Sequence, residues 1–183
     1  MFDLGLTALG LVLFALPMLG IGLAVWAHSG HPVFFHQARI GREGKPFVLW
    51  KFRTLTEDGR VTKIGQLLRG TAMDELPQLF QILKGEMSFV GPRPLIPEDL
   101  KELALIPDGN LRLSVRPGLT GMAQLFCSKT PTLSERLSWD LAYTRRCSLK
   151  MDAWLLARSV PVTLRAAWEK AGAKGSPPER LVA

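Results

Sequence analysis

Basic residues are missing from the first 38 positions of this 183-residue chain, and cysteine is scarce throughout. Residues 1–38 contain neither lysine nor arginine, and Asp3 is their single acid. All 23 basic residues and 15 of the 16 acids therefore lie in residues 39–183, which carry a net charge of +8. An apolar head on a basic body argues against a simple cytosolic enzyme.

Several motifs that identify enzyme classes are also missing. The two cysteines, Cys127 and Cys147, are too few for a disulfide scaffold and are not spaced as a CxxC pair. The body contains no Walker loop, no GxGxxG and no His/Cys group with zinc-ligand spacing. These absences exclude the common phosphate-binding loops and zinc motifs as the basis of function.

The apolar head contains one uncharged run of 24 residues, Leu4 to Ala27. This length meets the criterion for a membrane helix. Pro17 divides the run into arms of about 20 Å and about 15 Å, and neither arm alone crosses a hydrocarbon core of about 30 Å. The residues leave two shapes open, a kinked span and a re-entrant hairpin that enters and leaves by one face. The basic body is expected in the cytoplasm.

The most informative segment of the body begins with the acid pair Asp74 and Glu75. Apolar residues recur after the pair at helical spacing, and Pro77 suits a first helical turn. The pair is therefore predicted at the positive end of a helix dipole, where carboxylates stay ionised. Two interpretations remain. The acids cap the helix, or one attacks phosphorus covalently while the other serves as metal ligand or base.

Five cations are candidates for holding a phosphate beside that pair. They are Lys51, Arg53, Arg69, Arg93 and Arg116. Lys51 and Arg53 follow a predicted strand, and Arg93 and Arg116 each lie in a turn rich in proline and glycine. Cations must neutralise a phosphate before a carboxylate can attack it. The simpler interpretation is that each arginine is a solvated charge or a clamp on backbone carbonyls.

Five segments of the sequence, taken in chain order, resemble the bacterial sugar transferases, also called monotopic phosphoglycosyl transferases or polyprenyl-phosphate sugar phosphotransferases. The resemblance runs from Phe2 to about Trp168. The similar segments lie within residues 32–41, 47–54, 68–79, 84–94 and 115–121, and they include DELPQL, KGEMSFVGPRP and VRPGLTG.

This resemblance implies that a phosphosugar moves from a nucleotide diphosphate sugar, commonly a UDP-sugar, to polyprenyl phosphate with release of UMP. Such a step begins membrane-bound glycan assembly, as in exopolysaccharide biosynthesis. Asp74 would be the nucleophile that forms an aspartyl-phosphosugar intermediate, and Glu75 would help to place Mg²⁺ and to deprotonate the acceptor. Both acids are thus implied metal ligands, and the five cations are implied substrate-binding residues. The resemblance also favours a hairpin broken at Pro17, although the family usually has serine where this chain has Leu16.

The prediction for the fold is α+β, with an N-terminal proline-broken re-entrant membrane helix on a small, mainly helical cytoplasmic domain. That domain is expected to contain a short β-hairpin, with strands at residues 33–35 and 47–50, and amphipathic interfacial helices. Helices are predicted at residues 64–70, 133–145 and 151–168, and Pro161 is expected to bend or split the last of them. The expected divisions are residues 1–31 for the membrane element, 32–168 for the catalytic domain and 169–183 for a C-terminal tail.

The predicted location is the bacterial inner (cytoplasmic) membrane, with the catalytic domain on its cytoplasmic face and in contact with membrane lipid. A homo-oligomer is left open. No nucleic acid is expected as a partner, because the cations are scattered at turns rather than gathered on one basic helix. The alternative function is a membrane-anchored basic binding module without catalysis.

Overall fold

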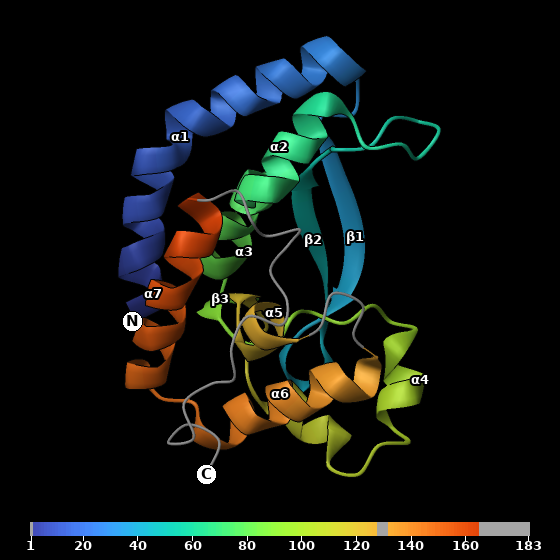
Figure 1. Ribbon diagram of the computed structural model, residues 1–183, viewed down its shortest axis with the longest axis vertical. Helices are drawn as coiled ribbons and strands as arrows, with labels where there is room; N and C mark the ends of the chain where they lie inside the picture. Colours follow the sequence, from blue (N-terminus) through green and yellow to red (C-terminus); the bar gives the residue numbers. More distant parts are fainter. Residues whose placement is uncertain (1, 128–131, 165–183) are drawn as a thin grey trace.

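The computed structural model describes residues 2–127 and 132–164, and Figure 1 shows their arrangement. In chain order the elements are α1 (Phe2–Ser29), β1 (Phe34–Ile40), η1 (Arg42–Gly44), β2 (Pro46–Phe52), α2 (Lys63–Thr71), η2 (Met73–Gln78), α3 (Leu79–Leu83), β3 (Ser88–Val90), α4 (Asp99–Leu103), η3 (Gly109–Ser114), β4 (Gly118–Thr120), α5 (Met122–Phe126), α6 (Leu133–Arg146) and α7 (Leu149–Leu164), where η denotes a 3₁₀ helix. The described part is mainly helical with a short hairpin, as the sequence predicts.

Helix α1 contains the apolar run and is long and apolar enough to cross a membrane. Figure 1 shows it bent into two arms, and Pro17 lies inside it. Proline removes a backbone hydrogen bond and clashes with the preceding turn, which accounts for a bend. The residues on both sides of Pro17 remain helical, so this is a bent helix and not two helices separated by a loop. The re-entrant hairpin stays a prediction.

Strands β1 and β2 form the predicted hairpin. They pair antiparallel, with Phe34 opposite Phe52 and Phe35 opposite Lys51. In the turn between them Glu43 has a φ of 59° and Gly44 a φ of 74°, which lets the chain reverse within a few residues. Strand β2 packs against η2, and this contact brings Lys51 to the acid pair.

The acid pair lies in a 3₁₀ helix, η2, and not at the start of an α-helix. Helix α2 ends with Ala72 in the left-handed conformation, at a φ of 56°, and η2 begins at the next residue. α-Helical structure begins only at Leu79 and ends before Gly85, whose φ is 77°. The prediction of an α-helix opening at Asp74 is therefore wrong for its first turns. Two features explain the tighter geometry. The chain reverses sharply at Ala72, and Pro77 lacks a backbone N–H.

A short parallel pair joins the two proline–glycine segments, which the sequence did not lead us to expect. Strand β3 pairs with β4, with Ser88 opposite Gly118 and Val90 opposite Thr120. The two backbones approach so closely that a Cβ on Gly118 would lie 2.1 Å from the amide nitrogen of Gly91. Glycine is required there because any side chain would overlap the facing backbone.

Helices α6 and α7 complete a hydrophobic core against this strand pair. Helix α6 confirms the helix predicted for residues 133–145, and α7 confirms the helix predicted from Met151 onward as far as Leu164, without interruption at Pro161. Trp168 and the tail 169–183 lie outside the described residues. The buried residues of this core are Val90, Met122, Leu125, Tyr143, Met151 and Leu155.

Candidate active site

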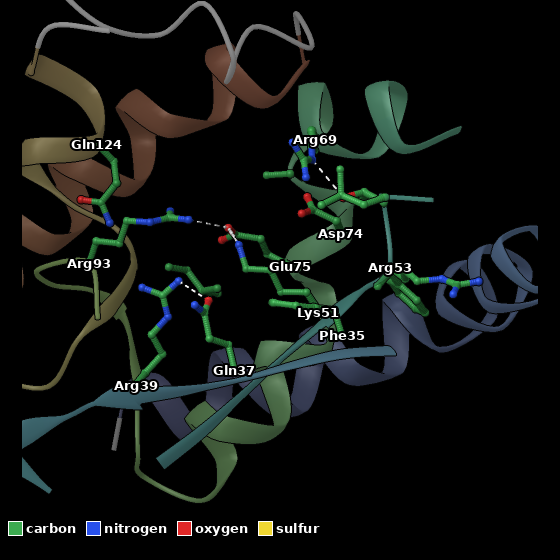
Figure 2. A pocket seen from close by; sticks show the side chains of 15 residues that line it. Phe35, Gln37, Arg39, Lys51, Arg53, Arg69, Asp74, Glu75, Arg93 and Gln124 are labelled. Atoms are coloured by element: carbon green, nitrogen blue, oxygen red, sulfur yellow. Dashed lines mark hydrogen bonds and ion pairs between the residues drawn. The ribbon is translucent and has the colours of Figure 1, made fainter. Parts of the chain in front are cut away.

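A cavity of about 590 Å³ lies where the β1–β2 hairpin, the end of α2, η2, the loop after β3 and α5 meet (Figure 2). The residues that line it are Phe35, Gln37, Arg39, Lys51, Phe52, Arg53, Thr54, Leu55, Arg69, Ala72, Asp74, Glu75, Arg93, Leu119 and Gln124. The acid pair and four of the five sequence-predicted cations are therefore brought together in one place.

Glu75 is held between two cations. Its Oε1 accepts a hydrogen bond from Lys51 Nζ and lies 3.5 Å from Arg93 Nη2, and its side chain is 17% exposed. Burial by itself would raise the pKa of Glu75, but Arg93 and Lys51 together lower the pKa below its ordinary value. Glu75 is therefore an anion across the physiological pH range, and it fixes the positions of both cations.

Asp74 is in the opposite electrostatic situation, although it is the adjacent residue. It is 7% exposed, and loss of hydration raises its pKa, an effect that Lys51 and Arg69 oppose and Glu75 reinforces. Arg69 Nε donates to Thr54 Oγ1 at 2.9 Å, which holds the guanidinium beside Asp74 (Figure 2). The environment thus separates the two pKa values, a pattern typical of carboxylates with different chemical roles.

Three polar residues at one end of the cavity were missed from the sequence: Gln37, Arg39 and Gln124. Arg39 donates to Gln37 Oε1 at 2.6 Å and to the carbonyl of Pro94 at 2.9 Å. Arg39 Nε and both amide atoms of Gln124 are buried without a hydrogen-bond partner among the described residues. Burial and the nearby Arg93 lower the pKa of Arg39. Unpartnered groups of this kind are suited to a polar ligand.

The signal for two of these residues was present in the strand periodicity. Side chains at alternate positions of a strand point to the same face, so Phe35, Gln37 and Arg39 share one face of β1. Phe35 pairs with Lys51 on β2, which places the cation predicted from the sequence on the same face. The strand alternation and the register of the hairpin together therefore predict Gln37 and Arg39 as residues of the site.

Arg53 reaches the cavity wall but directs its charge elsewhere. Its guanidinium donates to the carbonyls of Ser29, Gly30 and His31, at 3.0 Å for Gly30 and 3.1 Å for His31. These carbonyls lie at the C-terminal end of α1, where the helix dipole favours a cation. The interpretation of an arginine as a clamp on backbone carbonyls is therefore correct for Arg53, and its predicted contact with substrate stays untested.

Arg116 is not among the residues that line the cavity. It is exposed, and its guanidinium lies beside Gly85, where an added Cβ would be 3.7 Å from Arg116 Nη2. The cations that directly face the acid pair are therefore Lys51, Arg69 and Arg93.

Arg93 is positioned by a buried ion pair that the sequence did not lead us to expect. Arg112 Nε and Nη2 donate to Asp140 Oδ2 at 2.9 Å and 2.6 Å, and Nη2 also donates to the backbone carbonyl of Arg93 at 2.8 Å. Burial raises the pKa of Asp140 while Arg112 opposes the rise. A charged residue on the inward face of α6 is the sequence signal that could have identified this pair.

The two adjacent carboxylates are a suitable donor set for Mg²⁺ only in combination with a ligand. The described residues contain no group of three or more His, Cys, Asp or Glu side chains that could hold a metal. Mg²⁺ commonly uses one or two carboxylates together with substrate phosphates and water. Asp74 and Glu75 fit a cation of that shared kind, and do not form an all-protein cage.

The fold and the site define a protein in which a carboxylate pair, surrounded by fixed cations, lies close to a long apolar helix. The sequence profile of the bacterial sugar transferases matches residues 1–166. The chain belongs to the bacterial sugar transferase family, as its motifs indicate.

Relatives with assigned names share this region. The chain is 39% identical over 177 residues to the UDP-glucose:undecaprenyl-phosphate glucose-1-phosphate transferase of Klebsiella pneumoniae, covering 86% of this chain and 38% of that protein. It is 38% identical over 181 residues to the protein of the same name from Caulobacter vibrioides, covering 88% and 68%. It is 30% identical over 192 residues to the undecaprenyl-phosphate galactose phosphotransferase of Salmonella typhimurium, covering 90% and 40%. The chain thus spans well under half the length of two of these relatives.

Proposed function

We propose that this protein transfers a phosphosugar from a nucleotide diphosphate sugar, in the first instance a UDP-sugar, to polyprenyl phosphate. The products are a polyprenyl-diphosphate-sugar and UMP, and the intermediate is a phosphosugar bound covalently to Asp74. The names of the relatives support a sugar donor and a polyprenyl-phosphate acceptor. The observation that carries the proposal is the adjacent pair Asp74 and Glu75, with pKa values shifted in opposite directions inside a cation-lined cavity.

The first step requires a carboxylate to approach a diphosphate of the same sign. An oxygen of Asp74 forms a bond to the β-phosphorus, and the bond from that phosphorus to the bridging oxygen breaks, so that UMP leaves with the electron pair. Lys51, Arg69 and Arg93 reduce the repulsion and stabilise the charge that develops on the phosphoryl oxygens. The raised pKa of Asp74 makes its anion more basic, and hence more nucleophilic, than a solvated aspartate.

The second step regenerates Asp74. An oxygen of polyprenyl phosphate attacks the same phosphorus, and the bond to Asp74 breaks. A phosphate monoester loses its second proton with a pKa of about 6, so the acceptor is already largely a dianion at neutral pH. A monoanion would pass its remaining proton to Glu75. Because the pKa of Glu75 is lowered, its first role in the proposal is to position Lys51 and Arg93.

The proposal includes Mg²⁺ held by Asp74 and Glu75 together with the diphosphate. Bound in this way, Mg²⁺ supplies positive charge against the phosphate oxygens. Glu75 Oε1 is already engaged by Lys51 and Arg93, so the other oxygen of Glu75 and the carboxylate of Asp74 are the atoms that remain for the cation.

We also propose that α1 lies in the cytoplasmic membrane as a hairpin bent at Pro17, with the cavity on the cytoplasmic face. The support is the exposure of its apolar side chains, among them Val12 at 77% and Leu16 at 79%. Arg53 directly follows β2, the strand that carries Lys51. Its hydrogen bonds to the end of α1 therefore connect this helix to that strand. Such a link fixes the cavity at a constant depth relative to the membrane.

The activity is tested by measuring UMP release from detergent-solubilised protein with Mg²⁺, polyprenyl phosphate and a panel of UDP-sugars. We expect release with at least one donor and none from Asp74→Asn. Asp58→Asn is the matched control, because Asp58 is an exposed acid paired with Arg60. Failure of every donor would support the non-catalytic binding module, and full turnover by Asp74→Asn would exclude a covalent aspartate.

The topology is tested by labelling single cysteines placed at Phe2 and at Ser29, after replacing the exposed Cys147. A hairpin predicts that both positions react from the cytoplasmic side. Reaction from opposite sides would show a span.

A further inference from the structure

A smaller cavity of about 230 Å³, here called the side chamber, opens from the cation-lined cavity. Arg39, Arg93 and Gln124 line both spaces, so the two are continuous. Beyond these residues the side chamber is walled by α4, α5 and α6. Because Arg93 also contacts Glu75, the entrance to the side chamber lies next to the acid pair.

The walls of the side chamber offer both acceptors and donors of hydrogen bonds. Asp99 accepts the backbone N–H of Ile96 through Oδ2 at 3.3 Å, and its carboxylate has further lone pairs for a ligand. Neither amide atom of Gln124 has a partner among the described residues. The carboxamide of Gln124 is therefore able to turn toward a ligand without losing a hydrogen bond to the protein. Arg39 and Arg136 add N–H donors.

This mixture of groups suits a ligand that carries hydroxyl groups. A hydroxyl both donates and accepts, whereas the phosphates of the donor only accept and would be repelled by the carboxylate of Asp99. Ala123 and Cys127 add small, buried side chains to the wall and leave room for a sugar ring. Burial raises the pKa of Cys127 to about 11, so its thiol stays neutral and adds no charge.

The other end of the cation-lined cavity has a different character. Phe35 and Arg39 line this cavity from the same strand, β1, and are four residues apart, which is about 13 Å along a strand. Phe52 and Leu55 add apolar surface beside Phe35. No aromatic side chain from the described part of the chain lines the side chamber. A flat nucleobase, which stacks on aromatic side chains, therefore suits the Phe35 end.

We propose that the side chamber holds the sugar of the donor, and that Gln124 and Asp99 select the sugar through its hydroxyl groups. The inference rests on the proposed function and deepens it, because it names the part of the cavity that determines which sugar is transferred. The β-phosphate lies between Lys51 and Arg93, the sugar extends past Arg93 into the side chamber, and the uridine extends toward Phe35.

The assignment is tested with Gln124→Leu, which removes a donor and an acceptor at nearly constant size. Gln66→Leu is the matched control, because Gln66 is exposed on α2 and lines neither space. For the unaltered protein and both variants, UMP release gives kcat/KM for the preferred UDP-sugar and for analogues that each lack or invert one sugar hydroxyl. Calorimetry gives the Kd for UMP, which has no sugar beyond its ribose.

We expect Gln124→Leu to lower kcat/KM for the preferred donor by at least about tenfold, because a site that binds a hydroxyl loses its partner. For at least one analogue the loss should be much smaller, so that the preference for the natural hydroxyl largely disappears. The Kd for UMP should not change, and the control should match the unaltered protein throughout. An unchanged preference over the whole panel would overturn the proposal. Weakened UMP binding with the sugar preference retained would also overturn it, and would place the nucleoside in the side chamber.

A second measurement does not depend on the folding of a variant. A UDP-sugar with a photoreactive group in place of one sugar hydroxyl should label peptides that contain Asp99 or Gln124. A UDP-sugar with the group on the uracil ring should instead label peptides that contain Phe35 or Leu55. The reverse pattern would overturn the assignment. If the unaltered protein releases no UMP from any donor, the proposed function fails, whereas normal release with an unaltered sugar preference in Gln124→Leu rejects only the role of the side chamber.

Discussion

Arg112 and Asp140 form an ion pair almost entirely out of contact with solvent. Arg112 Nη2 lies 2.6 Å from Asp140 Oδ2, and the two side chains are 4% and 2% exposed. The same nitrogen donates to the carbonyl of Arg93, so the pair supports the turn that carries a cavity cation. A buried pair of this kind adds little net stability, but removal of one partner leaves an uncompensated charge.

Burial raises the pKa of Asp140, but Asp140→Asn also leaves the buried guanidinium of Arg112 without its counter-charge. This second effect dominates, and the substitution is expected to lower the free energy of unfolding by about 3–5 kcal/mol. Asp108→Asn is the control. It removes the exposed pair between Arg145 and Asp108, which is expected to cost at most about 1 kcal/mol. Chemical denaturation of both variants in the same detergent measures the loss in free energy of unfolding for each. Equal losses would contradict a structural role for the buried pair.

Asp74→Asn is expected to stabilise the fold at neutral pH while it abolishes transfer. The raised pKa of Asp74 means that the folded protein binds this proton more tightly than the unfolded chain does. Stability is therefore lost as the pH rises from below the ordinary value of 3.8 through the raised pKa. Asparagine does not titrate and escapes this loss. The thermal unfolding midpoints of Asp74→Asn and of the unaltered protein should diverge as the pH rises through this range. A difference that does not depend on pH would argue against the raised pKa of Asp74.

Glu75→Gln is expected to have the opposite effect on stability. Its lowered pKa contributes stability that is present above the ordinary value of 4.5 and is lost as the pH falls through the lowered pKa. The glutamine variant should be less stable than the unaltered protein at neutral pH, with the difference shrinking in acid. The same thermal scans measure both substitutions. A variant more stable than the parent at neutral pH would show that Lys51 and Arg93 do not compensate the burial of Glu75.

Arg53→Ala is expected to reduce stability and leave donor binding nearly unchanged. Hydrogen bonds that involve a charged group are worth about 1.5–3 kcal/mol, and the guanidinium of Arg53 is directed to the carbonyls at the end of α1. Arg93→Ala should instead raise the donor KM by about tenfold or more, because Arg93 faces the acid pair. Donor kinetics and unfolding measured on both variants separate the roles. A large increase in donor KM for Arg53→Ala would restore Arg53 to the substrate site.

The elements that could be predicted from the sequence are those specified by local pattern. The hairpin follows from two apolar segments on either side of a Gly-rich turn, and α2, α6 and α7 follow from helical periodicity. The acid pair was identifiable because Asp74 and Glu75 precede a proline and a helical repeat. Local patterns do not distinguish an α-helical from a 3₁₀ start, which depends on the left-handed residue Ala72.

The features that could not be predicted depend on contacts between distant segments. The pairing of Ser88 with Gly118 joins residues 30 positions apart and is permitted by Gly118 in β4 and by Gly91, which directly follows β3. The direction of Arg53 depends on where the end of α1 lies, and the pairing of Arg112 with Asp140 depends on the docking of α6. A single segment can mark one member of such a contact, as Asp140 on the inward face of α6 does, but it does not identify the partner.

The covalent intermediate on Asp74 is tested most directly by intact-protein mass spectrometry. The unaltered protein is mixed with Mg²⁺ and UDP-glucose, the donor in the names of several relatives, or with another UDP-sugar that supports UMP release, in the absence of polyprenyl phosphate. We expect one phosphosugar added per chain, mapped to the peptide that contains Asp74 and removed when polyprenyl phosphate is supplied. UMP release without any adduct, together with undiminished turnover by Asp74→Asn, would contradict a covalent intermediate on Asp74.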